Sequence, residues 1–545
     1  MRATRLSRRA LGVAGVLSLG LSGLGATALA APSGPGNIDF EQSGKLLIHK
    51  HVQSGTATPG TADGKDTGVK GDPVAGVKFT AYKLEADLKN QDTWAILSQL
   101  AVPNDACGSD FRTPAKTVGV LPVKAADASQ SDLTNDQGKA TIDNLAVGAY
   151  LVCETESPAK VVEKAAPFVV TVPFPNTKEN EKNGAGANSN GQWIYDVNVY
   201  PKNVVIDAPV KDVNVVSYGL NGEAQVEFPV TAKVPAIGAN TSFKHFIISD
   251  PMDVNYTSPA VKPNSVTIDG APIDQDWYKA TVNAGNEANI SFTQKGLEEL
   301  KKKPGSVISV TFTAKTQSVA AAINNQAKVY VDTIPGLIPP IAPPTTPPAG
   351  DPPVPSNKVV TAWGAASLLK QDKQSKQPLE GATFEIYNAK NPWEGTCTTE
   401  IAEDDKNTAI DESAKVTVDG KDVFTTDAQG KVDIKGLFVD SKKGAPGVEN
   451  VAVDHTTRCY VLKETKAPAG FTLPTGGAEL TPIKITAGQQ TTDNQVTVDN
   501  TKTTVPQLPL TGAAGKILMT VGGLSLMAIA VGFVLVARKR RVNEA

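Results

Sequence analysis

Runs in which apolar and polar residues alternate recur along most of the chain. Examples are Trp193–Tyr200 and Val307–Phe312, which are rich in Val, Ile, Thr and Tyr. Gly, Pro, Asn and Asp residues typical of turns separate such runs. A period of two is that of a strand with one buried face, and short strands divided by turns are typical of a β-sandwich. Helical patterns are scarce, and Gly296–Lys303 is one short candidate. The pattern therefore predicts an all-β fold.

Both ends of the chain depart from this pattern. Near the N-terminus, an apolar run at 10–24 follows four arginines and precedes Ala28-Leu29-Ala30, an A-x-A cleavage site. These are the parts of a secretory signal peptide, so residues 1–30 are excluded from the fold. Near the C-terminus, Ile517–Ala537 carries no charge. A helix of that length rises about 30 Å, enough to span the hydrocarbon core of a bilayer, and the basic run Arg538–Arg541 would stay in the cytoplasm.

An internal repeat identifies two related domains. The segment 134–145 matches 426–437, with six identical positions. Three matched blocks in the same order indicate a duplicated sandwich domain. The segment between the copies lacks these blocks, so we expect a different sandwich variant there. The two other pairs of matching blocks are Pro73–Tyr82 with Pro378–Tyr387, and Tyr150–Thr155 with Tyr460–Thr465.

The exported part, about 480 residues, is long enough for three domains. Ten of the residues at 335–355 are proline. Proline lacks the N–H that a sheet ladder needs and favours polyproline II, so we expect a semi-rigid spacer, with a docking motif for a proline-binding partner as the alternative. The expected segments are a signal peptide (1–30), an N-terminal domain (31–203), a middle domain (204–334), a proline-rich linker (335–355), a C-terminal domain (356–502) and a C-terminal segment with the apolar helix and basic tail (503–545).

Composition excludes several classes of function. The formal net charge is -3, and no basic patch favours nucleic acid. No G-x-S-x-G, Walker or H-E-x-x-H motif occurs, so we expect neither an enzyme nor a cofactor. His49 and His51 would share one face of a strand, but two ligands do not make a metal site, and none is expected.

Four cysteines in an exported chain imply two disulfides, for which three pairings exist. Cys107 and Cys153 fall in the N-terminal domain, and Cys397 and Cys459 fall in the C-terminal domain. Pairing within each domain is the simplest arrangement. Neither pair accompanies a catalytic-looking histidine, so a thiol protease has no support.

The pentapeptide Leu508-Pro509-Leu510-Thr511-Gly512 lies just before the apolar helix. It resembles the LPxTG sorting signal of Gram-positive sortase substrates. The resemblance implies that a membrane cysteine transpeptidase cuts between Thr511 and Gly512 and transfers the Thr511 acyl group to an amine. A transmembrane anchor alone would explain the helix and the tail but not the pentapeptide.

Two further motifs extend the resemblance to the shaft pilins of Gram-positive fimbriae. Trp193, Val197 and Val199-Tyr200-Pro201-Lys202 match every defined position of the pilin motif, W-x-x-x-V-x-V-Y-P-K. By that resemblance, Lys202 is the amine that accepts the threonine of another subunit. Tyr460–Phe471 is similar to the pilin E-box, Y-x-L-x-E-T-x-A-P-x-G-Y, with Phe471 in place of the last tyrosine.

Domains of this family often crosslink themselves through an isopeptide bond between a lysine and an asparagine, promoted by a buried acid. The alternative for each candidate set is an ordinary buried polar cluster. Asn324 competes with Asn325 in the middle domain, and the N-terminal E-box departs from the pattern at Ser157–Lys160, which weakens the case there. The candidate sets of lysine, asparagine and acid are Lys370, Asn500 and Glu464 in the C-terminal domain; Lys211, Asn325 and Asp250 in the middle domain; and Lys50, Asn203 and Glu154 in the N-terminal domain.

The resemblance covers nearly the whole chain. It implies tandem immunoglobulin-like (Cna-type) β-sandwich domains between a cleaved signal peptide and a sorting-signal helix. The implied function is that of the major structural subunit of covalently polymerised, cell-wall-anchored fimbriae that support adhesion and biofilm formation. The implied partners are a pilus-specific sortase, further copies of the chain joined head to tail, a tip pilin or adhesin, peptidoglycan, and host or bacterial surface receptors. The alternative is a wall-anchored monomeric adhesin, which would have no need of the pilin motif.

Overall fold

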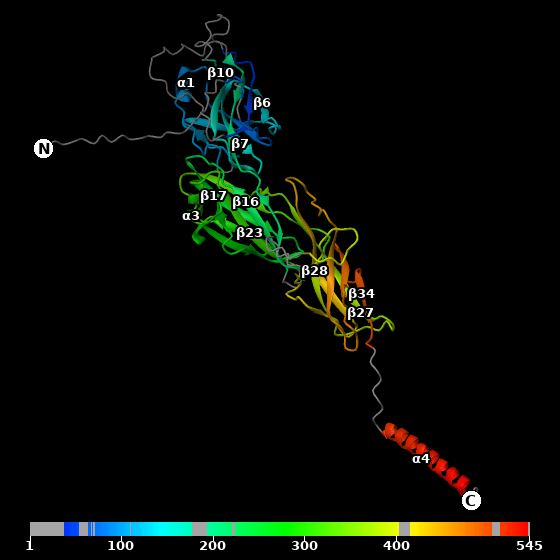
Figure 1. Cartoon of the computed structure of the whole chain (residues 1–545). Helices are drawn as coiled ribbons and strands as arrows, with labels where there is room; N and C mark the ends of the chain where they lie inside the picture. Colours follow the sequence, from blue (N-terminus) through cyan, green and yellow to red (C-terminus); the bar gives the residue numbers. More distant parts are fainter. Residues whose placement is uncertain are drawn as a thin grey trace, which may run out of the picture.

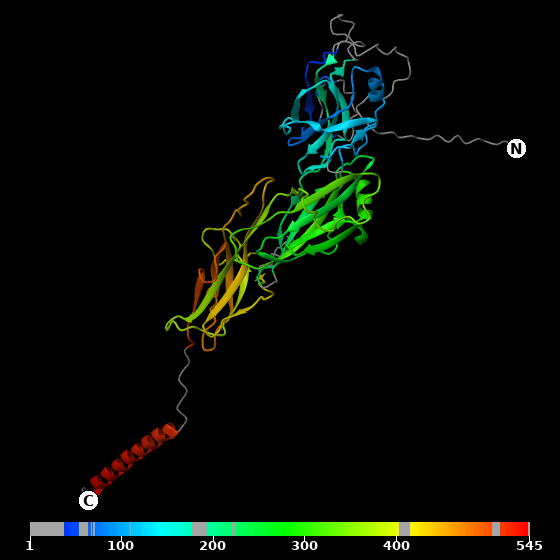
Figure 2. The ribbon, with the colours of Figure 1, turned by 180° about the vertical axis from the view of Figure 1, so that it is seen from behind.

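Three β-sandwich domains follow one another along one long axis in a computed structural model of the chain (Figures 1 and 2). Helix α4 (Ala513–Val542) lies beyond the last domain. The predicted signal peptide and the pentapeptide at 508–512 lie outside the described residues. The structure describes residues 38–53, 64–66, 68, 71–108, 111–176, 193–220, 224–402, 415–503 and 513–542. The all-β prediction is confirmed.

The N-terminal domain has a core that includes Leu46, Phe79 and Val197. Its elements are β1 (Gly44–His49), β2 (His51–Val52), β3 (Lys78–Leu84), α1 (Gln91–Ser98), β4 (Thr117–Val118), β5 (Leu121–Gln130), β6 (Lys139–Leu145), β7 (Gly148–Glu156), β8 (Val161–Glu163), β9 (Phe168–Val172), β10 (Phe174–Pro175), β11 (Trp193–Ile194), β12 (Asp196–Val199) and β13 (Lys202–Val205). One sheet has the order β4-β5-β3-β7-β9. The sheets β12-β1-β6 and β2-β13-β8 follow each other, because β1 leads into β2 and β12 leads into β13.

The middle domain is a second sandwich. Its elements are β14 (Val210–Lys211), β15 (Asn214–Val215), β16 (Gln225–Lys233), β17 (Thr241–Pro251), β18 (Tyr256–Val261), β19 (Thr267–Ile268), β20 (Ala271–Pro272), η1 (Gln275–Trp277), β21 (Tyr278–Asn283), β22 (Glu287–Phe292), α3 (Gln294–Lys301), β23 (Val307–Thr316), β24 (Ile323–Asn325), β25 (Lys328–Pro335) and β26 (Val354–Pro355). The sheet β14-β16-β23-β19-β20, with β15 and β18 added, faces the sheet β21-β22-β17-β25-β26.

Alternation in the sequence accounts for the longest strands of the middle domain. In β23, every second residue is buried, as the pattern at Val307–Phe312 predicts. β23 pairs antiparallel with β16, which places Phe228 opposite Phe312 in the core. The predicted helix is α3, which begins where the Thr293 hydroxyl accepts a hydrogen bond from the Gly296 N–H, a side-chain N-cap.

The C-terminal domain repeats the plan of the N-terminal one. Its strands are β27 (Val359–Asp372), β28 (Thr383–Asn388), β29 (Lys415–Val416), β30 (Phe424–Thr425), β31 (Lys431–Lys443), β32 (Thr457–Lys466), β33 (Leu480–Thr486) and β34 (Gln495–Asn500). One sheet contains β24-β27-β31 with β34 beside β27, and the other contains β29-β28-β32-β33 with β30 beside β28.

The middle and C-terminal domains share one apolar core. Strand β24 pairs with β27 of the following domain, with Asn325 opposite Val359. Tyr218 of the middle domain stacks on Phe438 of the C-terminal domain, with ring centroids 5.8 Å apart. Trp363 is fully buried beside both rings. The chain therefore passes from one domain to the next at the predicted boundary, but the apolar core continues across it.

The proline-rich segment, which composition predicts to be a semi-rigid spacer, contacts the middle domain. Its last residues form β26, which pairs with β25, so the segment folds back along the middle domain. The Thr345 carbonyl accepts a hydrogen bond from the Thr281 hydroxyl, and the Gly336 N–H donates to the Asn240 carbonyl. Its prolines lie at the ends of the paired strands or outside them, where no ladder N–H is needed.

Two disulfides lie inside single domains. Cys107 bonds to Cys153 and Cys397 bonds to Cys459, with sequence separations of 46 and 62. Closing loops of this length stabilises each domain by about 4 kcal/mol if the effect is chain entropy. Cys153 and Cys459 lie on the equivalent strands β7 and β32, but at different positions, because Cys153 aligns with Lys463 in the repeat.

The C-terminal helix is long and apolar enough to cross a membrane. The span Met519–Arg540 has a mean hydropathy of 2.2, and none of it is buried against the rest of the chain. The helix therefore has no packing partner among the described residues, as expected of a segment that lipid surrounds.

Candidate crosslinking and polymerisation sites

The C-terminal domain buries a lysine, a carboxylate and an asparagine together. Lys370 Nζ lies 2.8 Å from Glu464 Oε2 and 2.5 Å from Asn500 Oδ1. Asn500 Nδ2 donates to Glu464 Oε1 at 2.7 Å. All three residues are at most 2% exposed. The three side chains thus form a closed triangle that excludes water.

The strand order produces this triangle. β27 and β34 are parallel neighbours with Lys370 opposite Val498, so the lysine of the first strand lies within reach of Asn500 on the last. Glu464 comes from β32 in the facing sheet. The ammonium lies 5.6 Å from the Phe384 ring centroid. Burial lowers the pKa of Lys370 below its ordinary value, although Glu464 opposes the shift.

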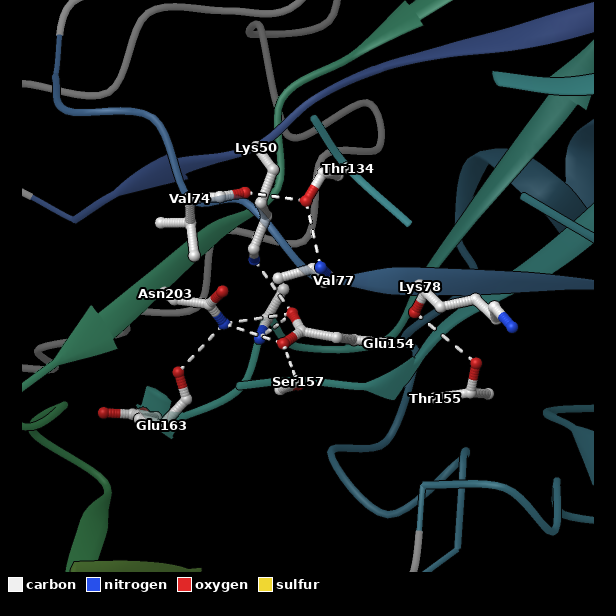
Figure 3. A network of polar contacts seen from close by, with 11 residues as sticks. Lys50, Val74, Val77, Lys78, Thr134, Glu154, Thr155, Ser157, Glu163 and Asn203 are labelled. Carbon is white, nitrogen blue, oxygen red and sulfur yellow. Dashed lines mark hydrogen bonds and ion pairs between the residues drawn. The ribbon is translucent and has the colours of Figure 1, made fainter. Parts of the chain in front are cut away.

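The N-terminal domain brings the equivalent three residues together around the carboxylate (Figure 3), but Asn203 Oδ1 has no hydrogen-bond partner among the described residues. Lys50 Nζ lies 2.8 Å from Glu154 Oε2, and Asn203 Nδ2 lies 3.0 Å from both Glu154 oxygens. Lys50 and Asn203 are fully buried. Burial lowers the pKa of Lys50 to about 8, against the effect of Glu154. Ser157, where the E-box departs from its pattern, donates to Glu154 Oε1 at 2.6 Å, so the departure leaves the carboxylate in place.

The middle domain brings its three candidates together in a different sandwich. Lys211 Nζ is paired with Asp250 Oδ2, and Asn325 Nδ2 lies 3.4 Å from the same oxygen. Lys211 and Asp250 are completely buried, and burial lowers the pKa of the lysine and raises that of the acid. Asn325 is the asparagine that contacts Asp250, whereas Asn324 pairs through its backbone with Val360. This contact favours Asn325 as the candidate.

A turn that occurs in both copies of the repeat positions the buried lysine of each outer domain. The sequence analysis did not predict this role. Gly138 and Gly430 occupy equivalent places in the repeat and have φ of 71° and 68°. Their carbonyls accept hydrogen bonds of 2.7 Å from the N–H groups of Lys50 and Lys370. A Cβ at either glycine would clash with the carbonyl oxygen of that lysine. The Gln-Gly-Lys identity in the repeat was the signal for this contact.

Lys202 lies next to one of these buried residues. It opens β13, paired with His51 of β2, and its side chain is half-buried. The next residue, Asn203, points into the core toward Glu154. Since neighbouring strand residues face opposite sides, the anchored Asn203 directs Lys202 outward. Tyr200 stacks on His49 with centroids 4.9 Å apart. Thr511 and Gly512 lie outside the described residues.

The chemistry available to each triangle is amide exchange. Burial lowers the pKa of all three lysines and so favours the free amine, and in the middle domain burial also raises the pKa of Asp250 and so favours its protonated form. A neutral amine is a nucleophile, and a carboxyl group that bonds to the asparagine amide can donate the proton that the departing nitrogen needs. A charged, hydrated surface lysine does not attack an unactivated side-chain amide in this way.

Comparison with known proteins places the whole chain in one group. It is 37% identical to "Fimbrial subunit type 2" of Actinomyces naeslundii, over 98% of this chain and 97% of the relative. The chain belongs to the family of Gram-positive fimbrial subunits. The fimbrial subunit is also 29% identical to "Fimbrial subunit type 1" of Actinomyces viscosus, over 98% of each chain. Family profiles match in order: Gram-positive pilin subunit D1, N-terminal domain (41–204), prealbumin-like fold domain (364–502) and LPXTG cell wall anchor motif (500–544).

Solved structures agree with this membership. The full-length major pilin SpaD from Corynebacterium diphtheriae superposes with a TM-score of 0.58 and 27% identity, over 86% of this chain and 99% of that one. The fimbrial subunit is thus a sortase-assembled major pilin of cell-wall-anchored surface fimbriae, and a structural protein rather than an enzyme. Peptidoglycan linkage and self-polymerisation follow from the same membership.

Substitution of Gly430 tests the role of the repeated turn. Gly430→Ala should lower the free energy of unfolding, because alanine is strained at positive φ by about 1–2 kcal/mol and its Cβ meets the Lys370 carbonyl oxygen. Gly420→Ala is the control, since Gly420 has φ of 70° but open space around its Cβ. In denaturant titrations, Gly430→Ala should be destabilised more than the control by at least about 1 kcal/mol. Equal losses would show that the contact with Lys370 is unimportant.

Proposed function

We propose that a sortase joins these subunits head to tail through Lys202 and Thr511. The enzyme breaks the Thr511–Gly512 peptide bond and holds Thr511 as a thioester. The Lys202 amine then attacks the Thr511 carbonyl carbon and releases the enzyme thiolate, so one amide bond replaces another. The observation that carries this proposal is the position of Lys202, directed outward beside the buried Asn203. Such a head-to-tail link does not close on itself and gives an open filament.

A second part of the proposal concerns bonds inside each subunit. In each buried triangle, the lysine amine attacks the asparagine Cγ, the Cγ–Nδ2 bond breaks, and ammonia leaves. The carboxyl group passes a proton to the departing nitrogen and recovers one from the lysine nitrogen. The pairs are Lys50 with Asn203, Lys211 with Asn325, and Lys370 with Asn500, with Glu154, Asp250 and Glu464 as acids. Water-free packing and the lowered lysine pKa values support this assignment.

These bonds would determine how tension passes along the filament. Force enters a subunit at Lys202 and leaves at Thr511. A Lys211–Asn325 bond would carry it past the strands of the middle domain, and a Lys370–Asn500 bond would carry it past those of the C-terminal domain. The N-terminal domain precedes Lys202, so the force does not run through it. Its Lys50–Asn203 bond would instead hold the strand on which the acceptor lysine lies.

The remaining partners follow from assembly on a surface. A tip pilin or adhesin would use the same acceptor chemistry, and the exposed shaft would meet host or bacterial receptors during adhesion and biofilm formation. A monomeric wall-anchored adhesin is the competing function. It would share the sorting signal but would not use Lys202.

Removal of the acceptor amine tests polymerisation. A Lys202→Ala strain should give single wall-linked subunits in place of the high-mass ladder seen on immunoblots of boiled wall extracts. Lys279→Ala, at an exposed lysine of the middle domain, should keep the ladder. Tandem mass spectrometry of digested wild-type fimbriae should find a branched Lys202–Thr511 peptide. A full ladder from Lys202→Ala would favour another acceptor.

Removal of an acid tests the internal bonds. Each bond lowers the intact mass by one ammonia, and Glu464→Ala should restore one of them, because neither the amine nor the amide is activated without the acid. Glu400→Ala, which removes a largely exposed carboxylate, should leave the ammonia loss unchanged. A Lys370–Asn500 bond closes a loop with a sequence separation of 130, which is worth about 5 kcal/mol by analogy with a disulfide, so Glu464→Ala should also lower the melting temperature. Unchanged ammonia loss in Glu464→Ala would leave Glu464 as an ordinary buried carboxylate.

A further inference from the structure

One histidine and two aspartates meet where the proline-rich segment lies on the middle domain. His245 on β17 and Asp332 on β25 are direct cross-strand partners beside a β-bulge, and Asp351 comes from the proline-rich segment. One nitrogen or oxygen from each residue lies within 4.8 Å of the others. This is the one such cluster of His, Cys, Asp and Glu among the residues the structure describes.

His245 is an anomaly for a buried polar side chain. It is 1% exposed, and neither of its ring nitrogens has a hydrogen-bond partner within the described part of the chain. Nε2 lies 3.3 Å from Asp351 Oδ2, but the orientation makes no hydrogen bond, and that oxygen also lacks a partner. A buried polar group left in this state costs about 1–3 kcal/mol. A bound group that accepts lone pairs from these nitrogen and oxygen atoms would remove this free-energy cost.

We propose that His245, Asp332 and Asp351 bind a divalent transition-metal cation, with Zn²⁺ as the best match. Zinc bonds to histidine nitrogen and carboxylate oxygen are about 2.0–2.2 Å long, so two ligands of a tetrahedral ion lie roughly 3.3–3.5 Å apart. The Nε2–Oδ2 separation of 3.3 Å has this length. Water would complete the coordination, since Asp351 is 34% exposed.

The donor set and the surrounding charges favour zinc over harder cations. Ca²⁺ and Mg²⁺ prefer shells of oxygen alone, whereas imidazole nitrogen suits Zn²⁺. Two carboxylates and a neutral imidazole balance the charge of the ion. Lys244 pairs with Asp332 Oδ2 at 2.8 Å, which leaves the other Asp332 oxygen for the metal.

The ion would fasten the chain between the two load-bearing crosslinks, a consequence that rests on the function proposed above. Between Asn325 and Lys370 the chain has neither a disulfide nor a candidate isopeptide bond. A metal held by Asp332 and Asp351 would close the loop between β25 and β26 and fix it to β17. Zinc binding itself does not depend on those crosslinks.

Zinc content of isolated fimbriae tests the site. Fimbriae stripped with a chelator and dialysed against Zn²⁺ should retain about one ion per subunit. His245→Asn and Asp351→Asn should each weaken retention by at least about tenfold. His455→Asn is the matched control, because His455 lies 3.2 Å from Asp440 but has no third ligand among the residues that the structure describes, and this variant should bind zinc like the wild type. Co²⁺ in place of Zn²⁺ should give the visible absorption of a low-coordinate site in the wild type and in His455→Asn, but not in His245→Asn.

Several outcomes would overturn the proposal. They are wild-type fimbriae that retain no zinc, equal retention in His245→Asn and the control, and complete displacement of zinc by excess Ca²⁺. If His245→Asn yields no fimbriae, Asp351→Asn at a partly exposed position decides the matter. The polymer ladder and the ammonia loss are measured on the same samples, so failure of the zinc site is distinguishable from failure of the proposed function.

Discussion

A lysine ammonium removed from water into an apolar sandwich is stable only with a partner that offsets its desolvation, and in each domain that partner is a carboxylate bound to an asparagine. Removing one member would leave an uncompensated buried group. In the two outer domains, the arrangement therefore requires the first strand, the last strand and the strand that carries the acid to be in register. The repeated turn at Gly138 and Gly430, the parallel pairing of first and last strands, and the phenylalanine beside each lysine are all consequences of this requirement.

The contacts between domains differ along the chain. The middle and C-terminal domains share an apolar core, which also takes in Val162 and Val204 of the N-terminal domain, and they are joined by an inter-domain strand pair. The N-terminal domain contacts the middle domain through Glu163, whose carboxylate accepts hydrogen bonds from Gly238 and Thr241 and whose backbone carbonyl accepts one from Asn203. Its site thus lies at the joint where one subunit would receive the next.

The fold and the buried sets of lysine, acid and asparagine could be predicted from the sequence, because both depend on local sequence patterns. Alternation identifies β23, and the repeat pairs the equivalent lysine, acid and asparagine of the outer domains. The fold of the proline-rich segment could not be predicted, since composition reports stiffness but not the strand that β26 joins. The cluster of His245, Asp332 and Asp351 could not be predicted from the sequence either. His49 and His51 are neighbours in sequence, whereas His245 meets its aspartates only through sheet pairing and a returning loop.

The central claim is that tension bypasses the strands of the middle and C-terminal domains, and pulling on single fimbriae tests it most directly. The account predicts that a subunit stretched through its Lys202 and Thr511 linkages gives at most the extension of the chain outside the two crosslinked loops (202–211, 325–370 and 500–511), roughly 220 Å. Release of the middle domain between Lys211 and Asn325 would instead lengthen the subunit by roughly 350 Å. Repeated steps of that larger size would contradict the account.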